Sequence, residues 1–499
     1  MEGKVDLRRK LNTFDVTNLV VGAIIGADIY VATGLGANLV GPSSLLIWVL
    51  AGVIAIVIAL AFAHCVMILP RVGGPYAYVR EVSSPFGGFI VGWSLLLAEW
   101  FSLAVFPVAF VQYFSALVPG VAGPYGVVIK GAFIMIVIVT NVIGIKAAGR
   151  FNDGLTLIKL SPLLLIILGG IAFLIAQPSI GSSNFSPFFK GDVFAFGQAL
   201  VLIFWAYAGF ELSTLPADEI ERPERTIPKA IVIGMTVVVA FYFLTNLVVM
   251  GSVSQVTLSS SASPLIESAS SIFGQVRPLS SIVMLVVGVG ALLSILGADE
   301  SGTIGTSRLA YAMSIDGLMP RVFSRSHSRF KTPYLGLIIL CSTAFVASLF
   351  GGLVSLINAS VFLLAFVYFL TCLSALLLPR KHPGSSKGIR FKIAIPVLGM
   401  IFSAVLMLLV EPMLIFTSLV LLTAGIPIYI WLTPKKELHE LRIAHLSREA
   451  ILRRTYAQRK RFLALPLNRL IRLIYRSTGT SSAWTPGDKE ESKNEGRAR

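Results

Sequence analysis

Charged residues are scarce in this sequence. Only 13% of the 499 residues are Asp, Glu, Lys or Arg, whereas soluble globular proteins contain about 25%. Hydrophobic residues make up 55% of the chain, and the mean hydropathy is +0.83. So few charges cannot cover so much apolar surface with a water-facing exterior. The composition therefore excludes a soluble enzyme, a disordered scaffold and a secreted disulfide-rich module.

Cysteine and histidine are rare as well. The three cysteines, Cys65, Cys341 and Cys372, all lie in apolar runs, and His64 is the lone histidine in the run that contains Cys65. An odd number of cysteines without metal-ligand spacing indicates free thiols rather than disulfides or a metal site. The sequence contains no Ser/His/Asp set, no metal-binding pair of histidines and no glycine-rich phosphate loop. We therefore expect no catalytic residues, no metal and no cofactor, and the chain is not expected to be an enzyme.

Long apolar runs are abundant. A helix of roughly 20 apolar residues crosses a bilayer core about 30 Å thick, and its backbone groups are bonded within the helix. The sequence predicts an all-α integral membrane protein with twelve transmembrane helices. They are Phe14–Leu35, Ser44–Leu69, Phe86–Val118, Gly126–Gly144, Leu155–Ala176, Phe194–Pro216, Lys229–Val253, Leu279–Met313, Leu335–Leu353, Leu356–Leu378, Phe391–Val410 and Met413–Leu432.

Positive charge is distributed unevenly between the loops. The loops that follow even-numbered helices contain sixteen Lys and Arg residues, and the opposite loops contain three. Because cytoplasmic loops of membrane proteins are enriched in basic residues, this asymmetry predicts a multi-pass protein of the cell membrane with both termini in the cytoplasm. The net charge of +16 therefore does not indicate a nucleic-acid partner.

The C-terminal tail, residues 433–499, is basic and contributes nine net positive charges. Between Arg453 and Arg476, basic clusters alternate with Leu, Ile, Phe and Tyr. This pattern favours an amphipathic helix on a surface of anionic lipids, which attract each basic residue by about 1 kcal/mol. A solvated tail that only orients the protein is the alternative. From Ser477 onward the composition of Gly, Ser and charged residues predicts disorder.

Two of the predicted helices are interrupted. The first contains GAIIGADIYVATGLGA (Gly22–Ala37), and the sixth contains FWAYAGFELSTLP (Phe204–Pro216). If the chain consists of two sets of five helices plus two more, these helices occupy matching positions, which is typical of inverted-repeat transporters. Unwound backbone exposes amides that favour a carboxylate and carbonyls that favour an ammonium group. Glycines that only permit close helix packing are the alternative.

Five carboxylates lie well inside the predicted helices, where each costs about 2.5–3.5 kcal/mol at a helix centre. They are Asp28, Glu99, Glu211, Asp299 and Glu300. Ionisable residues at this depth indicate proton relays or ligand partners. For Glu99 a neutral carboxyl group that bonds to a neighbouring helix is an equal alternative. Lys159 is open too: its side chain either reaches the cytoplasmic surface or is a buried amine that gains and loses a proton.

These motifs resemble the amino acid–polyamine–organocation transporters, and in particular their proton-coupled branch. The resemblance covers about Leu7 to Leu378 in order and rests mainly on GAIIGADIY (Gly22–Tyr30), PRVGGPYAYVRE (Pro70–Glu81), FWAYAGFE (Phe204–Glu211) and SRLAYAMSIDGLMP (Ser307–Pro320). It implies a LeuT-like five-plus-five inverted repeat at about 14–176 and 194–378. Two further helices at about 391–432 would complete a transporter domain, 1–432, ahead of the tail 433–499.

The resemblance also implies roles for particular residues. The substrate carboxylate would meet the interrupted first helix, and the substrate amine would meet carbonyl groups of the interrupted sixth helix, with Trp205 or Phe210 as an aromatic gate. The expected substrate-binding residues are Ile25, Gly26, Ala27, Asp28, Phe204, Trp205, Tyr207 and Phe210.

Proton coupling is expected at Lys159, whose charge would replace the cation of sodium-coupled relatives. Asp28 departs from the family pattern, which has glycine there; it would pair with Lys159, contact a substrate amine or carry the proton. The expected coupling residues are Lys159, Asp28, Glu211, Asp299 and Glu300.

We therefore predict a secondary active transporter that moves amino acids by proton symport with alternating access. The surplus of buried carboxylates supports an alternative, a polyamine or cationic amino acid exchanger. An amino acid sensor that binds its ligand without much transport is an alternative from another class. The expected partners are an amino acid substrate, protons and a lipid bilayer with anionic lipids at the tail, and no nucleic acid.

Overall fold

A computed structural model describes residues 11–71, 73–121, 123–143, 145–214, 220–274, 277–330, 332–384 and 391–432. The side chains of residues 145–158, 213 and 277–279 are outside this description. By its contacts the chain divides into two units, Met1–Leu432 and Thr433–Arg499. The second unit lies outside the described residues, so the lipid-binding segment expected there stays a prediction.

The regular structure of the described residues is helical, apart from one isolated bridge between Leu11 and Ile220. The helices are α1 (Thr13–Ile24), α2 (Ala27–Val40), α3 (Ser44–Ile68), α4 (Pro75–Val82), α5 (Pro85–Leu117), α6 (Pro124–Ile143), α7 (Ile145–Ala176), α8 (Pro178–Asn184), α9 (Val193–Trp205), α10 (Pro223–Ser252), α11 (Gln255–Ser260), α12 (Pro264–Phe273), α13 (Arg277–Ile315), α14 (Tyr334–Phe350), α15 (Leu353–Lys381), α16 (Ala394–Leu409) and α17 (Pro412–Leu432), with short 3-10 helices η1 (Gly41–Ser43), η2 (Phe210–Thr214) and η4 (Arg321–Ser324).

Nine segments of the described chain are long and apolar enough to cross a membrane, and α1, α14 and α16 are shorter apolar helices. Each of the twelve predicted apolar runs coincides with a helix or with two helices separated by an interruption. The molecule is therefore a multi-pass helical membrane protein. The number of crossings and the inverted repeat stay predictions.

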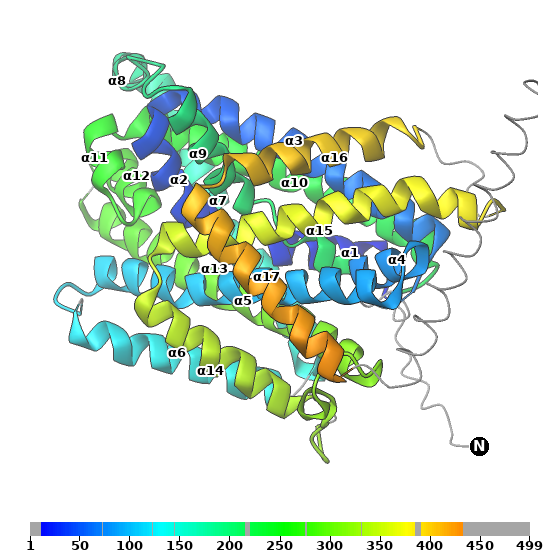
Figure 1. Ribbon diagram of the computed structural model, residues 1–499. Coiled ribbons are helices and arrows are strands. Elements are labelled where there is room, and N and C mark those ends of the chain that lie inside the picture. Colours follow the sequence, from blue (N-terminus) through cyan, green and yellow to red (C-terminus); the bar gives the residue numbers. More distant parts are fainter. Residues whose placement is uncertain are drawn as a thin grey trace, which may run out of the picture. The chain divides into compact units, whose positions relative to one another are not determined.

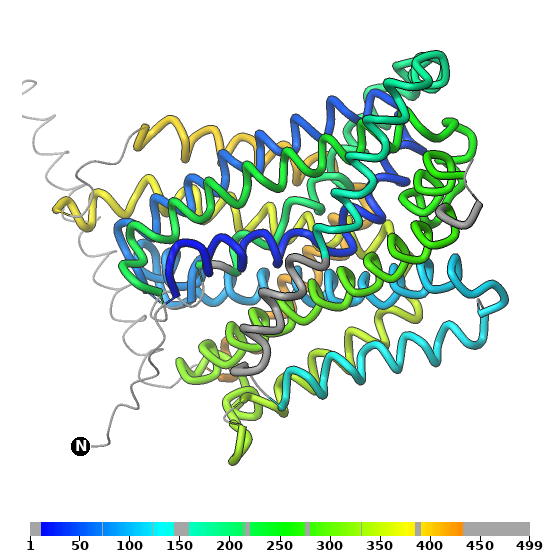
Figure 2. Tube along the Cα trace, turned by 180° about the vertical axis from the view of Figure 1, so that it is seen from behind, coloured from blue at the N-terminus to red at the C-terminus, as the bar shows by residue number. Residues whose placement is uncertain are grey.

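The helices that form the candidate site come from distant parts of the sequence. Helices α3 and α10 run side by side, and α6 lies beside α14 at the edge of the bundle (Figure 1). From the opposite side, α1 lies along α10 (Figure 2). Helix α5 packs against both α13 and α15. These contacts place α1, α5, α10 and α13 around the two interruptions.

Polar and apolar side chains are distributed as a lipid-facing protein requires. The outer faces of α6 and α17 expose apolar residues such as Val128, Met135 and Phe416. The interior is mainly apolar, with buried Ser, Thr and Asn side chains and a few ionisable groups. Among the described residues the buried ones, cysteines and tyrosines aside, are Asp28, His64, Glu99, Lys159, Glu211 and Asp299.

Candidate functional site

The first interruption separates α1 from α2 at Ile25 and Gly26. Helix α1 begins with a capping box between Asn12 and Asp15 and ends at Ile24, where the backbone leaves the helical conformation. A Cβ atom on Gly26 would lie 2.2 Å from the Cβ of Ala298. Glycine is therefore required here because α13 presses directly on the interrupted backbone.

The carbonyl groups at the end of α1 are bonded by side chains from three other helices. Lys159 Nζ on α7 donates to the Gly22 carbonyl at 3.0 Å. The Tyr242 hydroxyl on α10 donates to the Ile24 carbonyl at 3.0 Å, and Ser294 Oγ on α13 donates to the carbonyl of Ile25 at 3.4 Å. Because the last carbonyls of a helix lack intrahelical partners and carry partial negative charge, these donors stabilise an end that lipid would leave unbonded.

Lys159 is fully buried, with no exposed surface. Its side chain therefore does not reach the cytoplasmic surface, and the buried-amine interpretation describes its position. Asp28 and Glu300 both act electrostatically on its ammonium group. The structure thus brings together three of the five residues that the sequence singled out for coupling.

The surroundings of Asp299 and Glu211 differ from each other and from those of Lys159. Neither carboxylate oxygen of Asp299 has a hydrogen-bond partner among the described residues, and its charge acts on Cys341. Glu211, on η2, accepts a hydrogen bond from the Tyr368 hydroxyl at 2.9 Å. Of the four expected carboxylates, Asp28 and Glu300 act on Lys159, whereas Asp299 is linked to Glu300 and Glu211 is bonded to Tyr368.

The second interruption follows α9, which ends at Trp205. After a short turn, Gly209 adopts a φ of +114°, and its N–H donates to both carboxylate oxygens of Glu211 at 3.1 Å. A Cβ atom on Gly209 would lie 3.0 Å from the Ala23 carbonyl oxygen. The two interruptions therefore meet backbone to backbone.

The expected aromatic residues around this interruption are all buried. Trp205 Nε1 donates to Ser102 Oγ on α5 at 3.1 Å, so its indole ring bridges α9 and α5. Phe210 stacks on Tyr368 with ring centroids 5.4 Å apart, and Phe204 lies at 6.2 Å from the same ring.

Tyr207 contacts a different helix, α3. Its hydroxyl donates to the Trp48 carbonyl on α3 at 2.8 Å, and its ring packs against Tyr242. Trp205 therefore lies against α5 and Phe210 against Tyr368 on α15, whereas Tyr207 anchors the turn to α3.

Several residues of this region were not predicted from the sequence. They are the hydroxyl donors Tyr242, Ser294 and Tyr368 and the hydroxyl acceptor Ser102. One signal was available, since a hydroxyl inside an apolar helix must find a partner to offset its burial. That signal does not name the partner, which in each case is far away in the sequence.

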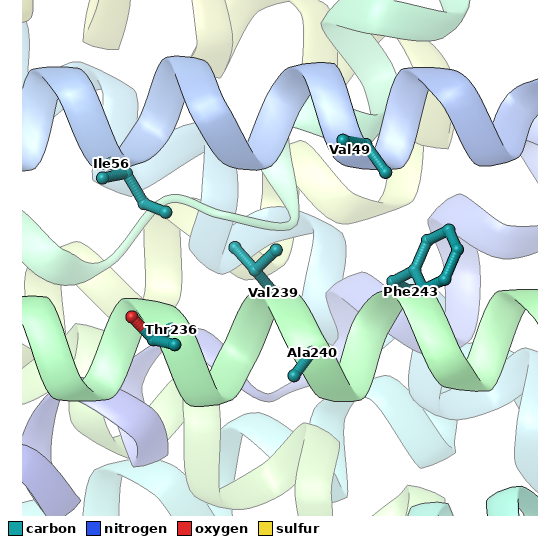
Figure 3. Close-up of a pocket in the computed structure, with 6 residues that line it drawn as sticks. All are labelled: Val49, Ile56, Thr236, Val239, Ala240 and Phe243. Carbon is teal, nitrogen blue, oxygen red and sulfur yellow. The ribbon is translucent and has the colours of Figure 1, made fainter.

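Two cavities lie away from the interruptions. A groove of about 300 Å³ between α3 and α10 is lined by Val49 and Ile56 on one helix and by Thr236, Val239, Ala240 and Phe243 on the other (Figure 3). It contains no charged side chain. A second cavity, of about 150 Å³, lies between α2, α5 and the connection from α11 to α12, beside Asn38 and Gln112. Neither cavity is lined by Asp28 or Lys159.

A metal site is not apparent in the part of the chain that the structure describes, where no group of three or more His, Cys, Asp or Glu residues could hold an ion. The chemistry of the interruptions is instead that of hydrogen bonds and single charges. Backbone carbonyls at the ends of helices, one ammonium group and several carboxyl groups are groups of the kind that bind an organic zwitterion or exchange protons.

Comparison with known proteins gives consistent results. Residues 11–433 match the family described as "Amino acid permease". The branched-chain amino acid permease BcaP of Bacillus subtilis (strain 168) is 28% identical over 460 residues, which cover 86% of this chain and 93% of the relative. The cystine/glutamate transporter of Homo sapiens is 29% identical over 442 residues, 85% of each chain. The methylthioribose transporter of Bacillus subtilis (strain 168) is 27% identical over 398 residues, 76% of this chain and 82% of that protein.

Proposed function

Because this chain belongs to the amino acid permease family, we propose that it is a secondary active transporter that moves amino acids across a membrane. The match confirms the family resemblance that the sequence motifs indicated. The family and the relatives are permeases and transporters, so the chain is not an enzyme. The proposal extends further to proton symport by alternating access, in a twelve-helix domain (1–432) with a LeuT-like repeat at about 14–176 and 194–378 and with both termini in the cytoplasm.

The direct contact between the two interruptions carries this proposal. Gly209 and the Ala23 carbonyl touch, and α2 packs against α9, so the two interruptions border one region. In the proposal, the substrate carboxylate binds at Ile25, Gly26 and Ala27. Its amine binds carbonyl groups near Phe204, Trp205 and Tyr207, and Trp205 and Phe210 close the site against α5 and α15.

Lys159 is proposed as the residue that couples this site to protons. Its ammonium group bonds the Gly22 carbonyl at the negative end of the α1 dipole. Loss of the proton would remove the charge that holds α1 to α7, and α1 would then be free to move. Asp28 and Glu300 balance this charge, whereas Glu211 and Asp299 belong to the proposal as separate proton-carrying groups.

A second substrate class, cationic amino acids or polyamines taken up by exchange, is favoured by the position of Asp28. This buried carboxylate lies in the first turn of α2, where the helix dipole favours an anion. The protein's own carboxylate thus occupies a position that a substrate carboxylate would use. A substrate with an additional amine would complement it.

Uptake into proteoliposomes tests the proposal. The full chain is reconstituted and offered radiolabelled leucine, glutamate, arginine and spermidine, with an inside-alkaline pH gradient that is imposed and then collapsed. We expect gradient-driven uptake of at least one probe, with arginine or spermidine preferred if Asp28 contacts an amine. Uptake that ignores the gradient would contradict proton symport, and intact binding without uptake would favour a sensor.

The coupling role is tested by Lys159→Ala, with Lys190→Ala, an exposed lysine, as the matched control. We expect gradient-driven uptake to be at least tenfold lower in Lys159→Ala than in the unmodified protein, and to be unchanged in the control. Normal accumulation by Lys159→Ala would show that the lysine only fills space.

A further inference from the structure

Tyr242, on α10, contacts both helix interruptions. Its hydroxyl donates to the carbonyl of Ile24, the last residue of α1, at 3.0 Å. Its ring packs against the ring of Tyr207, with centroids 5.3 Å apart, and Tyr207 lies in the turn that leads to Gly209. The hydroxyl of this side chain therefore binds the first interruption, while its ring packs against the second.

A third aromatic ring attaches these two tyrosines to α3. The indole ring of Trp48 lies 5.4 Å from the ring of Tyr242 and 5.9 Å from that of Tyr207, in both cases edge to face. The Tyr207 hydroxyl donates to the Trp48 carbonyl at 2.8 Å. All three residues are 0% exposed, and we call them the aromatic link. Because buried side chains are close-packed and barely compressible, a displacement at one end of the link is transmitted to the other.

The helix that carries Tyr242 is itself held closely on two sides. A Cβ atom on Gly234 of α10 would lie 2.7 Å from the side chain of Val20 on α1, which runs along α10 (Figure 2). A Cβ atom on Gly52 of α3 would lie 2.9 Å from the side chain of Val239 on α10. Helices α1 and α3 therefore both lie directly against α10, which gives the aromatic link a fixed support.

We propose that Tyr242 is a positioning residue that fixes the separation of the two interruptions and thereby selects α-amino acids. This proposal rests on the proposed function, in which the substrate carboxylate binds at the first interruption and the amine at the second. In an α-amino acid both groups are attached to one carbon atom, whereas a β-amino acid has one more carbon atom between them. Two half-sites at a fixed distance favour one of these spacings, because hydrogen bonds weaken steeply when a group is misplaced.

Uptake of matched substrate pairs tests the selection. Proteoliposomes that contain the unmodified full chain or Tyr242→Phe are offered leucine and β-homoleucine, and arginine and β-homoarginine. In Tyr242→Phe the ring still packs, but the Ile24 carbonyl is released. The ratio of kcat/KM for the α-amino acid to that for its β-homologue should therefore fall about three- to tenfold, the factor that one hydrogen bond contributes to an equilibrium constant. An unchanged ratio would overturn the selective role.

Tyr113→Phe is the matched control. The Tyr113 hydroxyl donates to the Tyr30 carbonyl at 2.9 Å, and Tyr113 is also 0% exposed. This bond ends within α2 and not at an interruption. The control should therefore lose a similar amount of stability to Tyr242→Phe but keep the substrate ratio. An equal fall of the ratio in both variants would show that general loosening, and not the position of Tyr242, causes it.

Thermal unfolding without substrate tests the aromatic link by itself. Tyr207→Phe breaks the link at its other end, at the Trp48 carbonyl. If the two bonds act as one link, the double variant should lose less Tm than the sum of the two single losses, because breaking either end already releases the rings. Additive losses would contradict the link.

The two measurements separate the possible failures. If Tyr242→Phe does not fold, the substrate ratio in Tyr207→Phe still decides the selection, since that variant should lower the ratio as well. Non-additive losses of Tm without uptake of any probe by the unmodified protein would contradict the proposed function and not the link. Uptake with the same ratio in both tyrosine variants and the unmodified protein would contradict the selection alone.

Discussion

The two helix interruptions meet in space but are stabilised differently. At the first interruption, the backbone groups that lack a partner within their helix are carbonyls. The side chains that donate hydrogen bonds to them come from α7, α10 and α13. At the second interruption, the backbone group without a partner in a helix is the N–H of Gly209. It donates to the carboxylate of Glu211, two residues further along the chain. The first interruption thus depends on how three other helices are placed, whereas much of the second is defined by its own short sequence. A conformational change that moves these helices should therefore alter the first interruption before it alters the second.

The largest effect on stability is expected from Gly26→Ala. The added Cβ atom would lie 2.2 Å from that of Ala298, and neither atom belongs to a flexible side chain that can move aside. Overpacking of this kind costs about 1–3 kcal/mol or more. Thermal unfolding of the detergent-purified protein should show a drop of several degrees in Tm.

Gly131→Ala is the control, because the nearest atom to its new Cβ, on the ring of Phe345, is 3.8 Å away. Its Tm should stay within a degree or so of the original. Equal Tm values for the two variants would mean that α13 does not press on the first interruption.

Removing one hydroxyl at each interruption compares them directly. Tyr242→Phe leaves the Ile24 carbonyl without its donor, and an unbonded buried polar group costs about 1–3 kcal/mol. Tyr368→Phe should cost less, about 0.5–1.5 kcal/mol, because Glu211 keeps its bonds to the Gly209 N–H. Urea or thermal unfolding of both variants checks the order. A larger loss in Tyr368→Phe would reverse the comparison.

The smallest effect is expected at Glu81, a carboxylate on α4 outside the candidate spans. Arg71 lies 3.5 Å from its carboxylate, and His382 Nε2 lies at 3.1 Å. Lys381 contacts it as well. Burial alone would raise the pKa of Glu81, but the His382 hydrogen bond and the Lys381 and Arg71 charges lower the pKa below its ordinary value.

Because the folded-state pKa of Glu81 is the lower one, its contribution to stability is present above the unfolded pKa of about 4.3 and is lost as the pH falls through the folded value. Glu81→Gln should cost about 0.2–1 kcal/mol at neutral pH, and the difference in Tm from wild type should shrink below pH 4. A Tm difference that persists in acid would show that the contribution is not ionic.

The sequence alone predicts most of the helices and both interruptions. Apolar runs of sufficient length must be helical in lipid, and glycines near Asp28 and Glu211 mark the two runs in which the helix is interrupted. Glycine beside a carboxylate does not decide the matter by itself, because Gly297 and Gly302 flank Asp299 and Glu300 inside the uninterrupted α13. The direction that the chain takes beyond an interruption cannot be predicted in this way, because it depends on contacts such as that between Gly26 and Ala298.

The partners of the buried groups were harder to predict, because they come from distant parts of the chain. Asp299 and Glu300 were both expected among the coupling residues, yet of these two only Glu300 acts on Lys159. Lys159 itself was undecided between the surface and the interior until its contact with the Gly22 carbonyl was known.

The contact between Gly209 and the Ala23 carbonyl has a consequence for the permeability of the bilayer. The space between them is smaller than a methyl group, so no water molecule can stand there. A continuous file of water at this depth would let ions pass without substrate. In the proposed transport cycle, close backbone contact at this point would insulate the membrane against leakage, and a separation of the two segments would have to be accompanied by closure elsewhere along the proposed path.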